Sequence, residues 1–266
     1  YGRAIRELER YNGQQGDDVV LTIDADLQRY AQERFGEDSG AAVVIDIHTG
    51  EILALVSNPG YDPNWFNVGI TGPQWRQLNN DKYKPLINKA IAGQYPPGST
   101  YKMLVGIAAL ESGNMTPETR VFCPGHMEFG NNTFHCWKKG GHGTMNFVSA
   151  LEESCDVYFY EAAKRTGVDK IGEIARKLGL GDFTGIDLTG ERRGIIPSRA
   201  WKQGALGQPW HPGENLVIGI GQGYVTTTPL QLAVMAARLA NGGYAVPPRI
   251  VRKEEGFGPA AYQRPA

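Results

Sequence analysis

Hydrophobic and polar residues follow two different periods along this chain, which predicts a mixture of strands and helices. Short, largely β-branched or aliphatic segments predict strands at residues 19–23, 42–47, 51–57 and 216–220. Longer segments with apolar residues three or four positions apart predict helices near residues 24–35, 99–112, 147–166, 168–178 and 228–241. The second and third strands flank His48-Thr49-Gly50, so we expect them to pair as a hairpin.

The segments between these elements are rich in glycine, proline and polar residues. They predict irregular structure at residues 58–94 and 185–210, and a loop that resembles an insertion at residues 123–142. We also expect the helix at 147–166 to be interrupted near residues 154–156. Strands and helices occur without regular βαβ alternation, which predicts an α+β fold.

Composition and charge exclude some classes of protein. The chain has 266 residues, with 27 Lys and Arg against 28 Asp and Glu, and a formal net charge of −1. This length can bury a core without disulfides or metal. The balanced charge argues against nucleic acid as a partner, because phosphate neutralisation needs an excess of Lys and Arg. The apolar runs are shorter than the roughly 18 residues of a membrane span.

Ser99 and Lys102 are the first candidates for catalysis. Their spacing puts a hydroxyl and an amine on one face of a helix, about one turn apart. A serine becomes nucleophilic when a neighbouring base accepts its proton, and a desolvated lysine can be that base. The alternative, a helix-capping serine beside a solvated lysine, is the commoner meaning of this spacing. The rigid segment at 95–98 (Tyr-Pro-Pro-Gly) favours a positioned nucleophile.

Ser154 and Asp156 are a second pair with possible chemistry. They lie two residues apart, near the expected break between helices, and could relay a proton and orient a lysine. Taken alone, such a pair more often caps a helix.

The three cysteines occur within a 33-residue window that also contains His126, His135 and His142. Three thiolates and one imidazole make a closed set of zinc ligands. The combination that we favour is Cys123, Cys136, His142 and Cys155. There is no Cys-x-x-Cys pair, so a disulfide with one free thiol, or three unrelated buried cysteines, are the alternatives.

Together these segments resemble the transpeptidase domain of class B penicillin-binding proteins, most closely the elongation-specific type. The resemblance covers about residues 16–251 and is carried by residues 46–56, 88–103, 137–143, 151–156, 219–223 and 228–231. It implies a fold like that of penicillin-binding proteins and serine β-lactamases, with an antiparallel sheet flanked by helices and an all-helical lobe. Position 156 is Asp, whereas many relatives have Asn, and this variant also occurs in the elongation-specific type.

The resemblance implies a peptidoglycan D,D-transpeptidase that β-lactams acylate. Ser99 would attack the stem peptide, Lys102 would accept its proton, Ser154 would pass a proton to the leaving amine, and Asp156 would hold this network. A β-lactamase, a D,D-carboxypeptidase, or a non-catalytic module that binds β-lactams or glycan remain alternatives. No organic cofactor is implied; a structural Zn²⁺ is possible, and the elongation-specific type has candidate ligands at comparable positions.

The resemblance also implies a context for the chain. We expect a linker from an N-terminal region at 1–15, the transpeptidase domain at 16–251 with a loop-rich metal-binding segment at 120–156, and a tail at 252–266. The domain would be periplasmic, held at the bacterial inner membrane by an N-terminal anchor, with a membrane glycosyltransferase of the elongation machinery as partner. The family's Lys-Thr-Gly or Lys-Ser-Gly strand does not occur in the sequence. We expect the C-terminal strands to be absent and full activity to require that motif.

Overall fold

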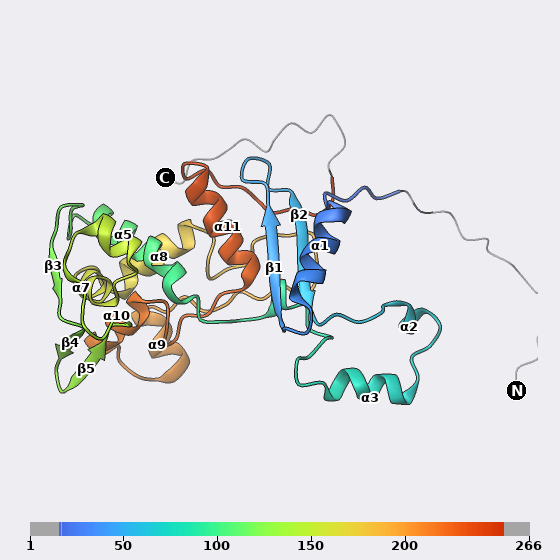
Figure 1. The fold of residues 1–266 in the computed structure, drawn as a ribbon, viewed down its shortest axis with the longest axis horizontal. Helices are drawn as coiled ribbons and strands as arrows, with labels where there is room; N and C mark the ends of the chain where they lie inside the picture. Colours follow the sequence, from blue (N-terminus) through green and yellow to red (C-terminus); the bar gives the residue numbers. More distant parts are fainter. Residues whose placement is uncertain (1–15, 17, 253–266) are drawn as a thin grey trace, which may run out of the picture.

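The computed structural model describes residue 16 and residues 18–252. The chain forms a small sheet with flanking helices at the centre and a larger lobe, mainly helical, at one end (Figure 1). Almost all of the predicted linker at 1–15 and tail at 252–266 lies outside the described residues. None of the described helices has both the length and the apolar character needed to cross a bilayer.

The predicted hairpin is confirmed. Strands β1 (Gly40–Ile45) and β2 (Ile52–Asn58) pair antiparallel, and the intervening turn is held by Asp46, which accepts hydrogen bonds from the N–H groups of His48 and Thr49. The hydrogen bond from Thr49 lowers the pKa of Asp46. Alternate residues of β2 are completely buried, as a half-buried strand requires.

Two helices cover this sheet (Figure 1). Helix α1 (Ala25–Phe35), capped by Asp24, lies alongside β2, where the side-chain amide of Gln28 hydrogen-bonds both backbone groups of Leu55. Helix α11 (Pro229–Ala240), which begins with a capping box at Thr228, packs against β1. The strand predicted at 19–23 is wrong. Only Leu21 forms a β-bridge, with Val251, because the partner segment is too short to pair with a whole strand.

The lobe is built around helix α7 (Asp156–Thr166), in which seven residues are buried. Around it pack α5 (Lys102–Glu111), α6 (Phe147–Glu152), α8 (Val168–Lys177) and α10 (Pro212–Gly219). The predicted interruption between α6 and α7 is confirmed, and α8 begins at the predicted residue and ends one residue earlier than predicted. Helix α5 is entered through a 3₁₀ turn, η1 (Gly98–Tyr101).

The strand predicted at 216–220 is wrong, because residues 216–219 belong to α10 and Ile220 follows its last turn. Pro212 occupies the first turn, and Glu214 completes a capping box with His211. A short apolar run cannot by itself distinguish a buried strand from a buried helix. Here packing against α7 requires a helix.

The three segments predicted as irregular also contain regular structure. Residues 58–94 include α2 (Asn64–Asn67), α3 (Gly72–Asn80) and α4 (Lys89–Ala92), and α9 (Arg199–Leu206) lies within 185–210. In and beside 123–142, β3 (Val121–Cys123) pairs with β6 (Gly143–Met145), and β4 (His126–Phe129) pairs with β5 (Asn132–His135). The lobe therefore carries two small strand pairs in addition to its helices.

Gly219 is expected to be essential for the contact between α10 and α7. A Cβ atom there would lie 2.6 Å from the Cβ of Ala163 and 2.8 Å from the carbonyl oxygen of Phe159. Gly219→Ala should lower the free energy of unfolding by about 1–3 kcal/mol in denaturant titrations. The control Gly204→Ala, in α9 with open space around it, should raise it by about 0.5–1 kcal/mol. Equal effects of the two substitutions would contradict this account.

Candidate active site and adjoining cysteine cluster

Ser99 lies at an exposed position in the 3₁₀ turn that leads into α5. The preceding chain is fixed on one side by residues 221–227: Tyr95 and Thr227 exchange two backbone hydrogen bonds of 2.9 Å, and the N–H of Gly98 donates to the carbonyl of Gly221 at 3.0 Å. Gly98 has φ of 58°, a conformation that favours glycine. The segment 95–98 therefore holds Ser99 at a defined place.

Lys102 is almost completely buried, with 1% of its surface exposed. Its ammonium donates to the carbonyl oxygen of Ser154 at 2.8 Å, to Ser154 Oγ at 2.9 Å and to Asp156 Oδ1 at 2.5 Å. These contacts use all three donors of a lysine. The alternative of a solvated lysine beside a capping serine is thus inconsistent with the structure.

Ser154 Oγ is the atom that connects Lys102 with the candidate nucleophile. It lies 2.9 Å from Lys102 Nζ and 3.0 Å from Ser99 Oγ. Ser154 has φ of 51°, an uncommon value for a residue with a side chain, and occupies the break between α6 and α7. This backbone conformation presents both its hydroxyl and its carbonyl to Lys102.

Asp156 begins α7, where the helix N-terminus favours a negative charge. Its second oxygen accepts a 2.9 Å hydrogen bond from the backbone N–H of Trp137. The indole N–H of Trp137 donates to the carbonyl oxygens of Glu153 and Ser154, both at 3.1 Å. Sequence reasoning gave Trp137 no role, although it begins one of the motifs, residues 137–143, that carry the family resemblance.

These residues open into a pocket of about 620 Å³. It is lined by Ser99, His135, Cys136, Trp137, Ser154, Asp156, Tyr160, Ile220 and Gln222. The exposed serine hydroxyl, hydrogen-bonded to a buried lysine through a second hydroxyl, can attack an electrophilic carbonyl. The N–H groups of the first helical turn can stabilise the resulting oxyanion.

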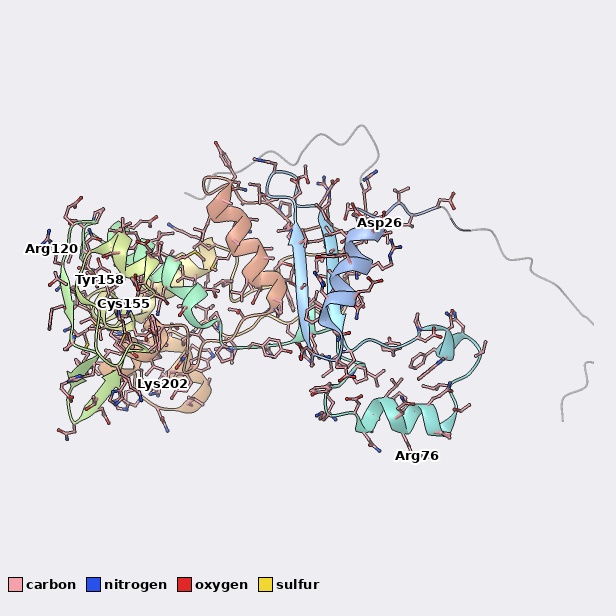
Figure 2. The ribbon with its side chains drawn as sticks, in the orientation of Figure 1. Asp26, Arg76, Arg120, Cys155, Tyr158 and Lys202 are labelled. Atoms are coloured by element: carbon pink, nitrogen blue, oxygen red, sulfur yellow. The ribbon has the colours of Figure 1, made fainter. Side chains whose placement is uncertain are left out.

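The predicted metal ligands come together beside this pocket, which Cys136 also lines. The ligand atoms of Cys123, Cys136, His142 and Cys155 all lie within 4.8 Å of one another, and the three cysteines are free thiols. His126 and His135 do not belong to this group. Figure 2 shows Cys155 among the helices of the lobe. Burial raises the pKa of the Cys155 thiol to about 12.

The spacing of these atoms fits a tetrahedral metal ion. His142 Nδ1 lies 3.6 Å from the sulfur of Cys123 and 3.5 Å from that of Cys136. Zinc bound to one sulfur and one imidazole nitrogen at ordinary bond lengths would separate those two atoms by about 3.6 Å. His142 Nε2 is buried without a hydrogen-bond partner among the described residues, so the polar contacts of the ring are to the two sulfurs.

Comparison with known families gives one match that covers most of the chain. The family model described as "Penicillin binding protein transpeptidase domain" matches residues 40–265. The "Peptidoglycan D,D-transpeptidase MrdA" of Escherichia coli K12 is 42% identical over 252 residues, which cover 94% of this chain and 40% of the relative. The chain thus spans about two fifths of the length of that relative.

Solved structures agree in fold. Pseudomonas aeruginosa PBP2 in complex with WCK 5153 has a TM-score of 0.87 and 41% identity, covering 92% of this chain and 54% of the other. A structure described as "Structural coordination of polymerization and crosslinking by a peptidoglycan synthase complex" has a TM-score of 0.79 and 37% identity, with 90% and 44% covered. The α+β fold is confirmed.

Asp156→Asn should strongly destabilise the protein, because it leaves the buried ammonium of Lys102 without a counter-charge. We expect a loss of about 3–5 kcal/mol in the free energy of unfolding, measured in denaturant. The matched control is Asp26→Asn, which removes the ion pair between Asp26 and Arg29. The side chains of this pair are 85% exposed for Asp26 and 67% exposed for Arg29. This control should change stability much less. A similar small change for both variants would show that Lys102 is not stabilised by Asp156.

Proposed function

Because the chain belongs to the penicillin-binding protein transpeptidase family, we propose that it is the catalytic part of a peptidoglycan D,D-transpeptidase that β-lactams acylate. The observation that carries this proposal is the hydrogen-bonded series from Lys102 through Ser154 to the exposed hydroxyl of Ser99. The name of the Escherichia coli relative supports the substrate class. Stem peptides ending in D-Ala-D-Ala are the proposed substrate.

In the first step, Ser99 Oγ attacks the carbonyl carbon of the penultimate D-Ala. Ser154 Oγ takes the proton of Ser99 and gives its own proton to Lys102, which must be neutral to accept it. Asp156 Oδ1, which lies 2.5 Å from Lys102 Nζ, stabilises the ammonium that forms. This path differs from direct transfer between Ser99 and Lys102, and it is supported by the position of Ser154 Oγ between them.

Collapse of the tetrahedral intermediate breaks the peptide C–N bond and leaves an ester on Ser99. The departing amine of the terminal D-Ala receives a proton from Lys102 through Ser154. An amine of a neighbouring stem peptide then attacks the ester carbonyl and gives a proton to Lys102 through Ser154. The bond between the acyl carbon and Ser99 Oγ breaks, and Lys102 returns a proton to Ser99 Oγ through Ser154, which forms the cross-link and restores the serine. In a β-lactam the leaving group stays attached to the acyl group, so the ester persists.

The same residues could serve a hydrolase if water reached the ester, and a binding module would bind without forming it. A β-lactamase or D,D-carboxypeptidase is therefore distinguished by the fate of the acyl-enzyme. We further propose a periplasmic location at the inner membrane and a membrane glycosyltransferase as partner. The resemblance of this chain to part of a peptidoglycan synthase complex supports that partner.

We also propose a structural Zn²⁺ held by Cys123, Cys136, His142 and Cys155, and no organic cofactor. All four ligands would come from the protein, so the ion would supply structural support and take no part in proton transfer. Cys155 lies between Ser154 and Asp156, and Cys136 precedes Trp137, whose N–H binds Asp156. These four ligands would therefore fix the carboxylate that stabilises Lys102.

Labelling with a fluorescent penicillin tests the proposed activity. The protein should form a stable adduct on the peptide that contains Ser99, and Ser99→Ala should abolish the label because the attacking oxygen is gone. The control Ser112→Ala, at the end of α5, should be labelled normally. Rapid loss of label would indicate a β-lactamase. No label on the wild-type protein would favour a binding module, or an active site that is incomplete without the Lys-Thr-Gly or Lys-Ser-Gly motif.

Metal analysis tests the zinc site. Protein purified without added zinc should contain about one zinc ion per chain, and Cys136→Ala should lose most of it because the ligand set is incomplete. His126→Ala is the matched control, since this exposed histidine lies in the strand pair β4–β5, which ends immediately before Cys136, but outside the cluster. Well-folded wild-type protein that contains no zinc would rule the site out.

A further inference from the structure

A second buried lysine has no part in the proposed chemistry. Lys202, on α9, is 1% exposed, and its ammonium lies 2.5 Å from Glu214 Oε1 on α10. Figure 2 labels Lys202 in the same lobe as Cys155. Removing a lysine from water is costly, and a buried ion pair is often no more stable than apolar residues of similar size. Stability alone is therefore a weak explanation for this pair.

Aromatic rings and further hydrogen bonds enclose the pair. Lys202 Nζ lies 5.8 Å from the ring centroid of Trp210 and 5.7 Å from that of Tyr224, within the range of cation–π attraction. The hydroxyl of Tyr224 donates to Glu214 Oε1 at 3.3 Å, and the N–H of His211 donates to Oε2 at 2.7 Å.

The surroundings of Glu214 favour its ionised form. Burial by itself would raise the pKa of Glu214, but the hydrogen bonds from Lys202 and from the N–H of His211 lower it below its usual value. The carboxylate therefore remains ionised beside Lys202. Its contact with Tyr224 extends the cluster from the two helices to the chain that follows α10.

Tyr224 lies at the end of a turn, residues 220–224, that forms one wall of the active-site pocket. Ile220 and Gln222 line this pocket together with Ser99. Gly221 accepts the hydrogen bond from Gly98, immediately before Ser99. A Cβ atom on Gly221 would lie 2.3 Å from the carbonyl oxygen of Gly98, so the turn and the nucleophile segment are in close backbone contact.

We propose that Lys202, Glu214 and Tyr224 form a positioning cluster that holds the turn 220–224 against the segment that carries Ser99. The two helices supply the charged pair, and the hydroxyl of Tyr224 attaches the turn to it. None of the three residues touches the reacting atoms. Their effect on acylation rests on the proposed function, whereas their effect on the turn does not.

The experiment compares Glu214→Gln and Tyr224→Phe with the wild-type protein. Glu214→Gln removes the charge of the carboxylate but keeps its shape, and Tyr224→Phe removes only a hydroxyl. Hydrogen–deuterium exchange should become faster in residues 95–101 and 219–227 in both variants. The maximal rate of Ser99 acylation by a fluorescent penicillin should fall about tenfold or more, because small displacements of a nucleophile cost rate. The penicillin concentration giving half of that rate should change less.

The matched control is Glu51→Gln, which breaks the partly buried ion pair between Glu51 and Arg249 beside the sheet. It makes the same chemical change away from the turn, so exchange at 95–101 and acylation should both stay at wild-type values. Lowered stability in Glu214→Gln with unchanged exchange and acylation would overturn the proposal. If the wild-type protein is not acylated at all, the proposed function fails, and the exchange measurement alone decides whether the cluster positions the turn.

Discussion

The burial of one ammonium group, that of Lys102, constrains where the helices around it begin and end. A lysine that is 1% exposed needs an acceptor for each of its donors and a negative charge nearby. The chain meets this need by ending α6 early, placing Ser154 in a left-handed conformation and starting α7 at Asp156. The break between two helices is therefore a consequence of the charge that it surrounds.

The residues that support Asp156 adjoin the cysteine cluster. Trp137 donates its backbone N–H to the carboxylate, and Cys136, the residue before it, is one of the four residues of the cluster. Cys155 is the residue before Asp156 and belongs to the same cluster. The donor and the acceptor of this hydrogen bond therefore each directly follow a cysteine of the cluster. A displacement of the cluster would reach the hydrogen bond through a single peptide unit on each side.

Local sequence signals were sufficient for some of this arrangement. The caps at Asp24 and Thr228 and the hairpin at His48-Thr49-Gly50 depend on residues close in sequence. The four predicted cysteine and histidine ligands also come together. They could be chosen from the sequence because few combinations of such residues occur in that window. In contrast, the contacts of Trp137 with Asp156 and of Gly221 with Gly98 use backbone groups, which leave no side-chain signature. The helix at 212–219 could not be distinguished from a strand by its sequence, because its packing against α7 is a tertiary contact.

Two buried lysines in one lobe differ in what surrounds them. Lys102 contacts a hydroxyl that itself reaches an exposed serine, so a proton can pass between its nitrogen and the pocket. The described neighbours of Lys202 are a carboxylate and two aromatic rings, and Tyr224 directs its hydroxyl to the carboxylate. A lysine side chain held in this way is fixed in place by its partners. The same side chain can therefore take part in proton transfer in one position and hold a turn in place in another, according to whether its partners lead to the pocket.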